Sequence, residues 1–157
     1  MTRNYARAAP GQRVKEATPQ GRWQILTMLA ALTIRGLEAP MTIAEPTDGD
    51  IFLAYLDQVL CPQLRPGQVV IMDNLSAHKV EGVRVLIEAT CARLLYLPPY
   101  SPDLNPIEQA WSKVKQLLRS LKARTAEALK AAVAEALAAI TSENAVAWFS
   151  HCGYGLH

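Results

Sequence analysis

Long hydrophobic runs are missing from this 157-residue sequence. None approaches the roughly 20 apolar residues that a membrane-spanning helix needs. The N-terminal stretch MTRNYARAAPGQR carries charge with no apolar stretch behind it, so it does not resemble a signal peptide. Cysteine is scarce, because Cys61, Cys91 and Cys152 are odd in number and have no metal-binding or redox spacing. These absences predict a soluble cytoplasmic protein with reduced cysteines and no membrane partner.

A large net charge is also absent, since the formal charge is only +2. The charges are nevertheless segregated: residues 36–64 contain five acids and no Lys or Arg, whereas residues 109–124 contain five bases and no acid. Residues 1–24 form a second basic patch. The bases of the two patches are Arg3, Arg7, Arg13, Lys15 and Arg22, and Lys113, Lys115, Arg119, Lys122 and Arg124. Such patches predict a polyanionic partner, although two solvated faces explain them equally well.

The apolar patterns predict one α/β domain, because half of the residues are hydrophobic and strand-like segments alternate with helical ones. Residues 38–50 are expected to form a loop, with Asp50 as the N-cap of the next helix. Strands are predicted at about 13–17, 23–34, 69–72 and 93–98, and helices at about 51–60, 80–92, 107–122, 125–140 and 142–151. Ligands of such folds gather at the carboxyl ends of strands.

The stretch VVIMDNLSAH, residues 69–78, has an acid at the end of an apolar run. Asp73 follows the predicted strand directly, so it is either a turn former or a carboxylate held for chemistry. His78 lies five residues further on, where it either supports a ligand or phosphate contact or is an ordinary surface or capping histidine. The position of Asp73 favours a functional role.

A second acid lies in the stretch LNPIEQAW, residues 104–111. Asn105 suits an N-cap and Pro106 the first helical position. Glu108 then either completes a capping box or binds a metal ion. It begins a stripe at helical spacing that continues with Ser112, Lys115, Arg119 and Lys122. A carboxylate followed by cations suits a magnesium ligand beside a track for phosphates, and a solvated face is the alternative.

The motifs VVIMDNLSAHK and LLYLPPYSPDLNPIEQAWSKVK, together with the spacing of Asp73 and Glu108 along the chain, resemble the DDE transposases of bacterial insertion sequences in the mariner-like superfamily. The segments YARAAPGQR, GRWQILTMLAAL and FLAYLDQVLCPQLRPGQ resemble the same family. The resemblance implies a ribonuclease-H-like mixed sheet flanked by helices. It also implies DNA as substrate, both transposon ends and target, and Mg²⁺ or Mn²⁺ held by three acids. Asp73 and Glu108 match the second and third acids, and both are expected to be catalytic metal ligands.

The first acid of the family has no match in this chain. In the family it lies on the first, central strand, upstream of the segment that resembles MTRNYARAAPGQR. Asp48, Asp50 and Asp57 are poor substitutes, because they fall in a predicted loop and helix. We therefore expect an N-terminally truncated chain without its central strand, and weak or no activity of the chain alone.

Two functions remain open at this point. One is a catalytic domain, residues 1–124 with a helical extension at 125–157, that cleaves and joins DNA with a first aspartate from an upstream transposase fragment. The other is a non-catalytic transposase remnant that binds DNA or interferes with the intact enzyme. A homodimer is a further implication of the resemblance. A phospho-acceptor receiver domain is disfavoured, because the sequence has no early acid pair and no later lysine at a strand end.

Overall fold

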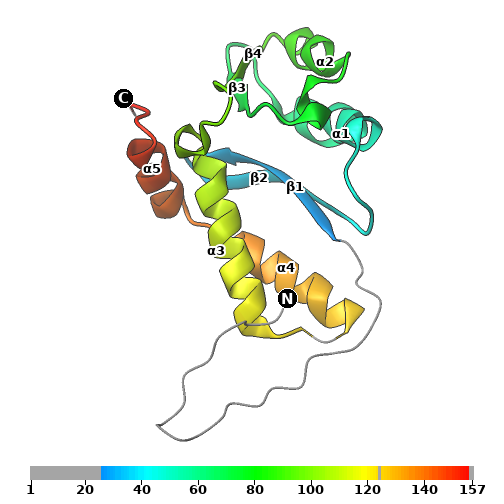
Figure 1. Cartoon of the computed structure of the whole chain (residues 1–157), viewed down its shortest axis with the longest axis vertical. Coiled ribbons are helices and arrows are strands. Elements are labelled where there is room, and N and C mark those ends of the chain that lie inside the picture. Colours follow the sequence, from blue (N-terminus) through cyan, green and yellow to red (C-terminus); the bar gives the residue numbers. More distant parts are fainter. Residues whose placement is uncertain (1–25, 124, 156–157) are drawn as a thin grey trace, which may run out of the picture.

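The computed structural model describes residues 26–123 and 125–155 (Figure 1). The strand predicted at 13–17 and the start of the strand predicted at 23–34 lie outside this part. The described helices and strands alternate along the chain as an α/β domain, which confirms the predicted class. Their bounds are β1 Thr27–Thr33, β2 Gly36–Ile43, α1 Gly49–Tyr55, β3 Val69–Met72, α2 Val83–Ala89, β4 Arg93–Tyr96, α3 Pro106–Leu121, α4 Ala126–Ala138 and α5 Ser142–His151.

Strands β1 and β2 form an antiparallel hairpin in the middle of the molecule. Gly36 opens β2 with a φ of 123°, a conformation that glycine adopts without steric cost. A Cβ atom on Gly36 would lie 2.9 Å from the carbonyl oxygen of Ile140, so the residues after α4 also require glycine here. Glycine is therefore required at position 36 both by the backbone conformation of the turn and by the packing of the segment that follows α4.

The prediction of a loop over residues 38–50 is wrong, because residues 36–43 form β2. Leu29 lies opposite Met41 and Ala31 lies opposite Glu38, so β2 has one extra residue in a β-bulge. Ala39 takes a positive φ of 51° within it. A bulge on a strand with a free outer edge tolerates Pro40, which had indicated a loop.

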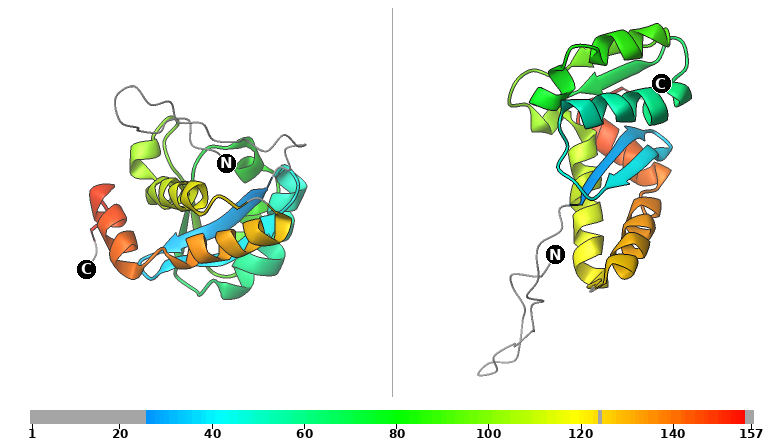
Figure 2. Two further views of the ribbon diagram at one scale, coloured as in Figure 1. Left: turned by 90° about the horizontal axis from the view of Figure 1, so that it is seen from below. Right: turned by 90° about the vertical axis from the view of Figure 1, so that its right-hand side faces the viewer.

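The hairpin lies between two hydrophobic cores. Leu29 and Ala31 pack into the core formed with α1, α2, β3 and β4, whereas Met28 and Leu32 pack into the core formed with α3 and α4. This division follows from the alternation of side chains along a strand. Figure 2 shows the resulting layers, with the hairpin between α1 on one side and α3 and α4 on the other.

Strands β3 and β4 form a parallel pair that α2 connects. Val70 and Met72 face the first core, whereas Val69 and Ile71 are 46% and 38% exposed. Among the described residues, the sheet consists of two separate pairs, β1–β2 and β3–β4.

Helix α1 begins earlier than predicted, because Asp48 and not Asp50 is its N-cap. The Asp48 Oδ1 atom accepts a hydrogen bond of 2.9 Å from the Ile51 amide. Asp50 falls inside the first turn, where a carboxylate favours the positive helix end. The helical path then continues as a π-helical turn, Leu56–Leu60, and a 3₁₀ turn.

Helix α3 is the longest described helix and packs against β1, α4 and α5. Its buried side chains include Ala110, Val114 and Leu118. Leu121 is 38% exposed, because the helix ends there and Lys122 turns into a left-handed conformation. No helix in the described ranges is both long enough and apolar enough to cross a membrane.

Candidate metal centre

Asp73 follows the last residue of β3, as predicted from the sequence. Its Oδ1 atom accepts a hydrogen bond of 3.0 Å from the Leu75 amide, which closes a local turn of the kind that aspartate favours. The same oxygen lies 2.7 Å from His78 Nδ1. Both contacts use Oδ1, which leaves Oδ2 as the oxygen available to a cation.

The residues after Asp73 are fixed by contacts with α1, with β4 and with the residue that follows β4. The His78 ring lies 4.5 Å from the Phe52 ring of α1, measured between centroids. The Tyr96 hydroxyl of β4 donates a hydrogen bond of 2.6 Å to the His78 carbonyl oxygen. Asn74 Nδ2 donates to the Leu97 carbonyl oxygen. His78 is therefore packed against Asp73 rather than left on the surface, which supports the interpretation that it assists a ligand.

Glu108 lies in the first turn of α3, after Asn105 at the N-cap and Pro106 at the first position. The Asn105 side chain makes no capping hydrogen bond, and the Asn105 amide donates to the Pro102 carbonyl instead. The Glu108 carboxylate is exposed and has no hydrogen bond or ion pair within residues 26–123 and 125–155. The capping-box alternative is therefore not what the structure contains, and this carboxylate is available to a ligand.

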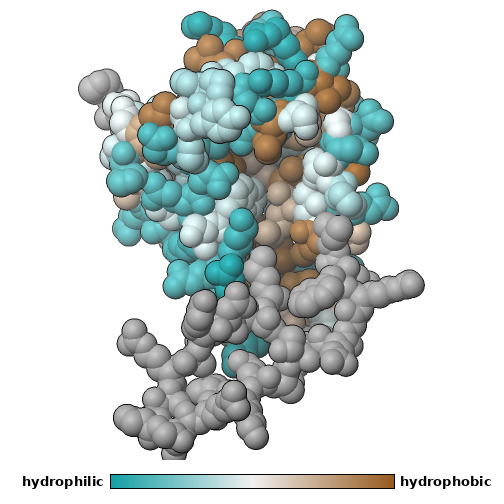
Figure 3. All heavy atoms as spheres, viewed as in Figure 1, coloured by the Kyte–Doolittle hydropathy of each residue, from teal (hydrophilic) through white to brown (hydrophobic). Residues whose placement is uncertain are grey.

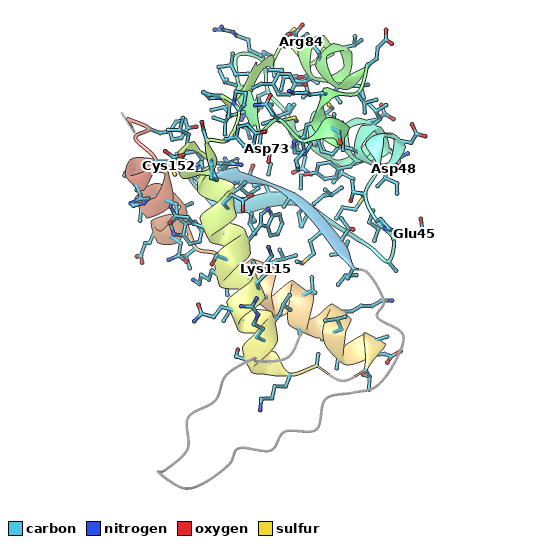
Figure 4. All side chains as sticks on the ribbon, in the orientation of Figure 1. Glu45, Asp48, Asp73, Arg84, Lys115 and Cys152 are labelled. Atoms are coloured by element: carbon cyan, nitrogen blue, oxygen red, sulfur yellow. The ribbon has the colours of Figure 1, made fainter. Side chains whose placement is uncertain are left out.

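Asp73 and Glu108 line the same groove, which has a volume of about 360 Å³. Figure 4 shows Asp73 between the β3–β4 pair and the hairpin, near the start of α3. Residues of β1, β3, α1, α3 and α5 complete the walls of this groove. Two carboxylates that are far apart along the sequence thus line one groove.

This donor set fits one divalent cation. Mg²⁺ usually takes one or two protein carboxylates and completes its shell with water and phosphate oxygens. A pair of catalytic ions, about 3.5–4 Å apart, needs further ligands. Within the described part of the chain, no group of three or more His, Cys, Asp or Glu side chains could hold a metal ion. Asp48 caps α1 and does not line the groove, so it does not join Asp73 and Glu108 there.

The basic residues of α3 separate into two kinds. Lys113 Nζ donates hydrogen bonds of 2.9 Å to the Ala139 carbonyl and 2.5 Å to Asn144 Oδ1, so it ties α3 to the C-terminal helices. Lys115 and Arg119 are exposed on the stripe that Glu108 begins, and Figure 4 marks Lys115 on α3. Only the latter two keep the geometry of a predicted phosphate track; Arg124 and the N-terminal patch lie outside the described residues.

Tyr55 of α1 also lines the groove. The residue is only 2% exposed, and its hydroxyl has no hydrogen-bond partner among the described residues. Burial, and secondarily the neighbouring Cys61, raise the pKa of Tyr55 far above its usual value. A buried hydroxyl without a partner costs about 1–3 kcal/mol of stability, so the Tyr55 hydroxyl is a destabilising group in the groove wall.

Sequence patterns identified both acids but not their surroundings. Phe52, Tyr96 and Asn74 support the Asp73 region from positions far apart in the chain, and no local pattern marks them for this task. The groove itself was also not predicted, because it depends on how two separate strand pairs face each other.

Comparison with solved structures shows which fold the chain has. The Mos1 Strand Transfer Complex matches with a TM-score of 0.70 and 20% identity over 96% of this chain and 46% of that chain. The Mos1 mariner paired end complex with Mn matches with a TM-score of 0.65 and 18% identity over 96% and 47%. The fold is therefore of the ribonuclease-H-like α/β class that the resemblance implied.

Sequence comparison identifies the family. The family model described as DDE superfamily endonuclease matches residues 1–130. The chain belongs to this family, and its domain is similar to the catalytic domain of transposases. It is 37% identical over 62 residues to the Transposable element Tc1 transposase of Caenorhabditis elegans, which covers 40% of this chain and 23% of that protein. The chain spans less than half the length of each of these relatives.

Proposed function

We propose that this chain is the catalytic part of a transposase that cleaves DNA and joins strands with a divalent cation held by Asp73 and Glu108. The observation that supports this most strongly is that Asp73 and Glu108 both line one groove. Membership of the DDE superfamily endonuclease family and the Mn named with one solved relative support the use of Mg²⁺ or Mn²⁺. When bound, such an ion supplies positive charge for the attacking and leaving oxygens of a phosphate ester.

The residues around the groove have separate tasks in this proposal. Asp73 and Glu108 hold the cation, and His78 keeps the Asp73 carboxylate in one orientation through its 2.7 Å contact. Lys115 and Arg119 attract the phosphates of transposon-end and target DNA, which they can do because they are exposed beside Glu108 on α3. The phosphate track therefore lies on the same helix, α3, as Glu108 of the cation site.

Metal binding by the full chain tests the assignment of the two acids. We expect Mn²⁺ titration, followed by calorimetry and electron paramagnetic resonance, to detect one site that Asp73→Asn and Glu108→Gln each weaken by about tenfold or more. Asp50→Asn is the matched control, because Asp50 is an exposed acid in the first turn of α1 and does not line the groove. Equal Mn²⁺ affinity in all four proteins would refute the proposal.

A non-catalytic remnant is the second candidate, and the lack of a cluster of three ligands among the described residues favours it. As a remnant, the chain binds DNA through its basic patches with an affinity that falls as salt rises. Asp73→Ala then changes neither DNA binding nor any interference with intact transposase. The catalytic proposal instead requires Mn²⁺-dependent nicking of element-end DNA once a first acid is supplied. Nicking that Asp73→Ala abolishes distinguishes the two.

The remaining parts of the proposal concern organisation and partners. We assign residues 1–124 to the ribonuclease-H-like part and residues 125–157 to a helical extension of the same domain, supported by the packing of α4 and α5 on α3. An upstream transposase fragment supplies the first acid, and a homodimer assembles on DNA in the cytoplasm. Light scattering of the chain with and without DNA tests the dimer.

A further inference from the structure

The first turn of α3, which carries Glu108, begins with little local support. The Asn105 side chain makes no capping hydrogen bond, although asparagine is a favoured N-cap residue. Pro106 follows at the first helical position and has no amide hydrogen to donate. The preceding segment, Pro102–Leu104, is a single 3₁₀ turn without a buried residue. The direction in which Glu108 projects therefore depends on contacts from elsewhere in the fold.

The segment that follows α5 supplies such contacts. The Tyr154 hydroxyl donates a hydrogen bond of 2.8 Å to the carbonyl oxygen of Leu104, the residue directly before the N-cap of α3. Gln109 Nε2 lies 3.9 Å from the sulfur of Cys152, and Figure 4 shows Cys152 near the start of α3. Residues 152–154 thus contact the chain both before Glu108, at Leu104, and directly after it, at Gln109.

The backbone after α5 fixes the place of the Tyr154 side chain. The Gly153 amide donates to the Ser150 carbonyl, and the Tyr154 amide donates to the Phe149 carbonyl. These are the two hydrogen bonds of a Schellman motif, and Gly153 has the positive φ, 85°, that this motif needs. The Tyr154 ring packs edge-on against the Phe149 ring, with 5.6 Å between the centroids. Local hydrogen bonds and ring packing therefore set the position of the hydroxyl.

Helix α5 is itself attached to α3, so Tyr154 projects from a fixed element. Asn144 in the first turn of α5 forms a capping box with Thr141. Its Oδ1 atom also accepts the hydrogen bond from Lys113 Nζ of α3. The start of α5 is thus joined to α3 beyond Glu108, and the segment after α5 is joined to the turn before Glu108. Figure 1 shows α5 beside the first half of α3.

We infer that Tyr154 is a positioning residue of the metal centre, whose hydroxyl holds the turn before α3 so that Glu108 lines the groove beside Asp73. This inference rests on the proposed function. Tyr154 and Phe149 belong to the wall of the same groove. Tyr154 acts through the backbone: the Glu108 side chain keeps its rotamer freedom, whereas the turn from which it projects is held. Residues that orient a metal ligand in this indirect way contribute to metal affinity.

A single hydroxyl group tests the inference in the full chain. Tyr154→Phe removes the donor to Leu104 and keeps the ring that packs on Phe149. We expect Mn²⁺ affinity, measured by calorimetry, to fall about fivefold, the ratio that one net hydrogen bond typically supplies. Tyr100→Phe is the matched control, because Tyr100 precedes the same turn but is fully exposed and does not line the groove. Equal Mn²⁺ affinity of Tyr154→Phe and the wild-type protein would overturn the inference.

A double-substitution cycle distinguishes positioning from a general structural role. If Tyr154 acts through Glu108, Tyr154→Phe causes no further loss of Mn²⁺ affinity once Glu108→Ala has removed the carboxylate. In the Asp73→Asn protein, Tyr154→Phe should still weaken Mn²⁺ binding about fivefold, because Glu108 remains. Equal losses in the two backgrounds would show that Tyr154 only stabilises the fold, and would overturn the inference.

Hydrogen exchange measures the effect on the turn without any metal. The amides of Asn105 and Glu108 donate to the carbonyls of Pro102 and Asn105. We expect both amides to exchange faster in Tyr154→Phe and at the wild-type rate in Tyr100→Phe, measured by nuclear magnetic resonance. Unchanged exchange in Tyr154→Phe would overturn the inference.

The Glu108→Ala protein separates this inference from the proposed function. Mn²⁺ binding that Glu108→Ala leaves unchanged refutes the proposed metal centre, and the positioning role of Tyr154 with it. Mn²⁺ binding that Glu108→Ala weakens and Tyr154→Phe does not keeps the metal centre and refutes the positioning role alone. Weaker binding in both single variants, with faster exchange in Tyr154→Phe, supports both.

Discussion

The two acids of the groove are supported very differently. Asp73 lies in a turn that contacts α1 through Phe52 and β4 through Tyr96. Glu108 projects from the first turn of α3, and its carboxylate has no protein partner in the described residues. A side chain fixed by packing holds a ligand geometry before the ligand arrives, whereas a free one must lose rotamer entropy on binding. In the proposed metal centre, the Asp73 region is therefore pre-organised, whereas Glu108 would become ordered only when a cation binds.

The Phe52→Ala substitution, which removes a contact of the Asp73 region, should cause the largest loss of stability. Phe52 is 4% exposed in the first core, and its ring packs against the His78 ring. Loss of a buried phenylalanine typically costs about 3–5 kcal/mol of unfolding free energy, measured by urea denaturation. Ile107→Ala is a useful comparison, since Ile107 is a half-buried residue beside Glu108 and should cost less. Equal losses would contradict the difference between the two regions.

His78→Ala should reduce Mn²⁺ affinity without a comparable loss of stability. Residues that orient a metal ligand typically contribute about 10–100-fold to affinity, and His78 Nδ1 contacts the Asp73 carboxylate directly. Calorimetric titration measures the change. Lys79→Ala is the control, because its side chain is exposed in the same turn. If the two substitutions weaken Mn²⁺ binding equally, His78 has no special role in positioning Asp73.

Tyr55→Phe should stabilise the folded protein. The Tyr55 hydroxyl is buried without a partner in the part of the chain that the structure describes, so its removal should add about 1 kcal/mol to the unfolding free energy at neutral pH. The pKa of Tyr55 is raised in the folded protein. The unfolded tyrosine therefore ionises first, and the wild-type protein loses stability as pH rises above about 10.

The difference between Tyr55→Phe and the wild-type protein should accordingly grow in urea titrations above that pH. Tyr154, whose pKa burial also raises, is present in both proteins and does not contribute to the difference. A destabilised Tyr55→Phe protein at neutral pH would show that the hydroxyl has a partner after all.

Glu108→Gln should have the smallest effect on stability. Because the carboxylate has no protein partner in the described part, we expect the unfolding free energy to change by no more than about 0.5 kcal/mol. Asp73→Asn should cost more, since Asp73 accepts from Leu75 and contacts His78. Urea denaturation of both variants makes the comparison directly, and a larger loss for Glu108→Gln would reverse it.

Local patterns predicted most elements and both acids. The apolar run at 69–72, the Asn105–Pro106 helix start and the amphipathic spacing of α3 each act over a few residues, so the sequence alone reveals them. The failures were also local. Pro40 indicates a loop in the sequence, because the bulge that accommodates it forms only when β2 pairs with β1. Asp48 and Asp50 have the same side chain, so residue type alone does not show that Asp48 is the N-cap of α1.

The sequence by itself determined the class of fold, the family resemblance, and the identity of Asp73 and Glu108, since these depend on residue type and spacing along the chain. Tertiary structure decided that both acids line one groove, that His78 contacts Asp73 and that Lys113 joins α3 to α5. It also decided that residues of β1 and β3 line the same groove. Contacts between distant residues depend on how the two cores pack around the hairpin, and no periodicity within one segment encodes that packing.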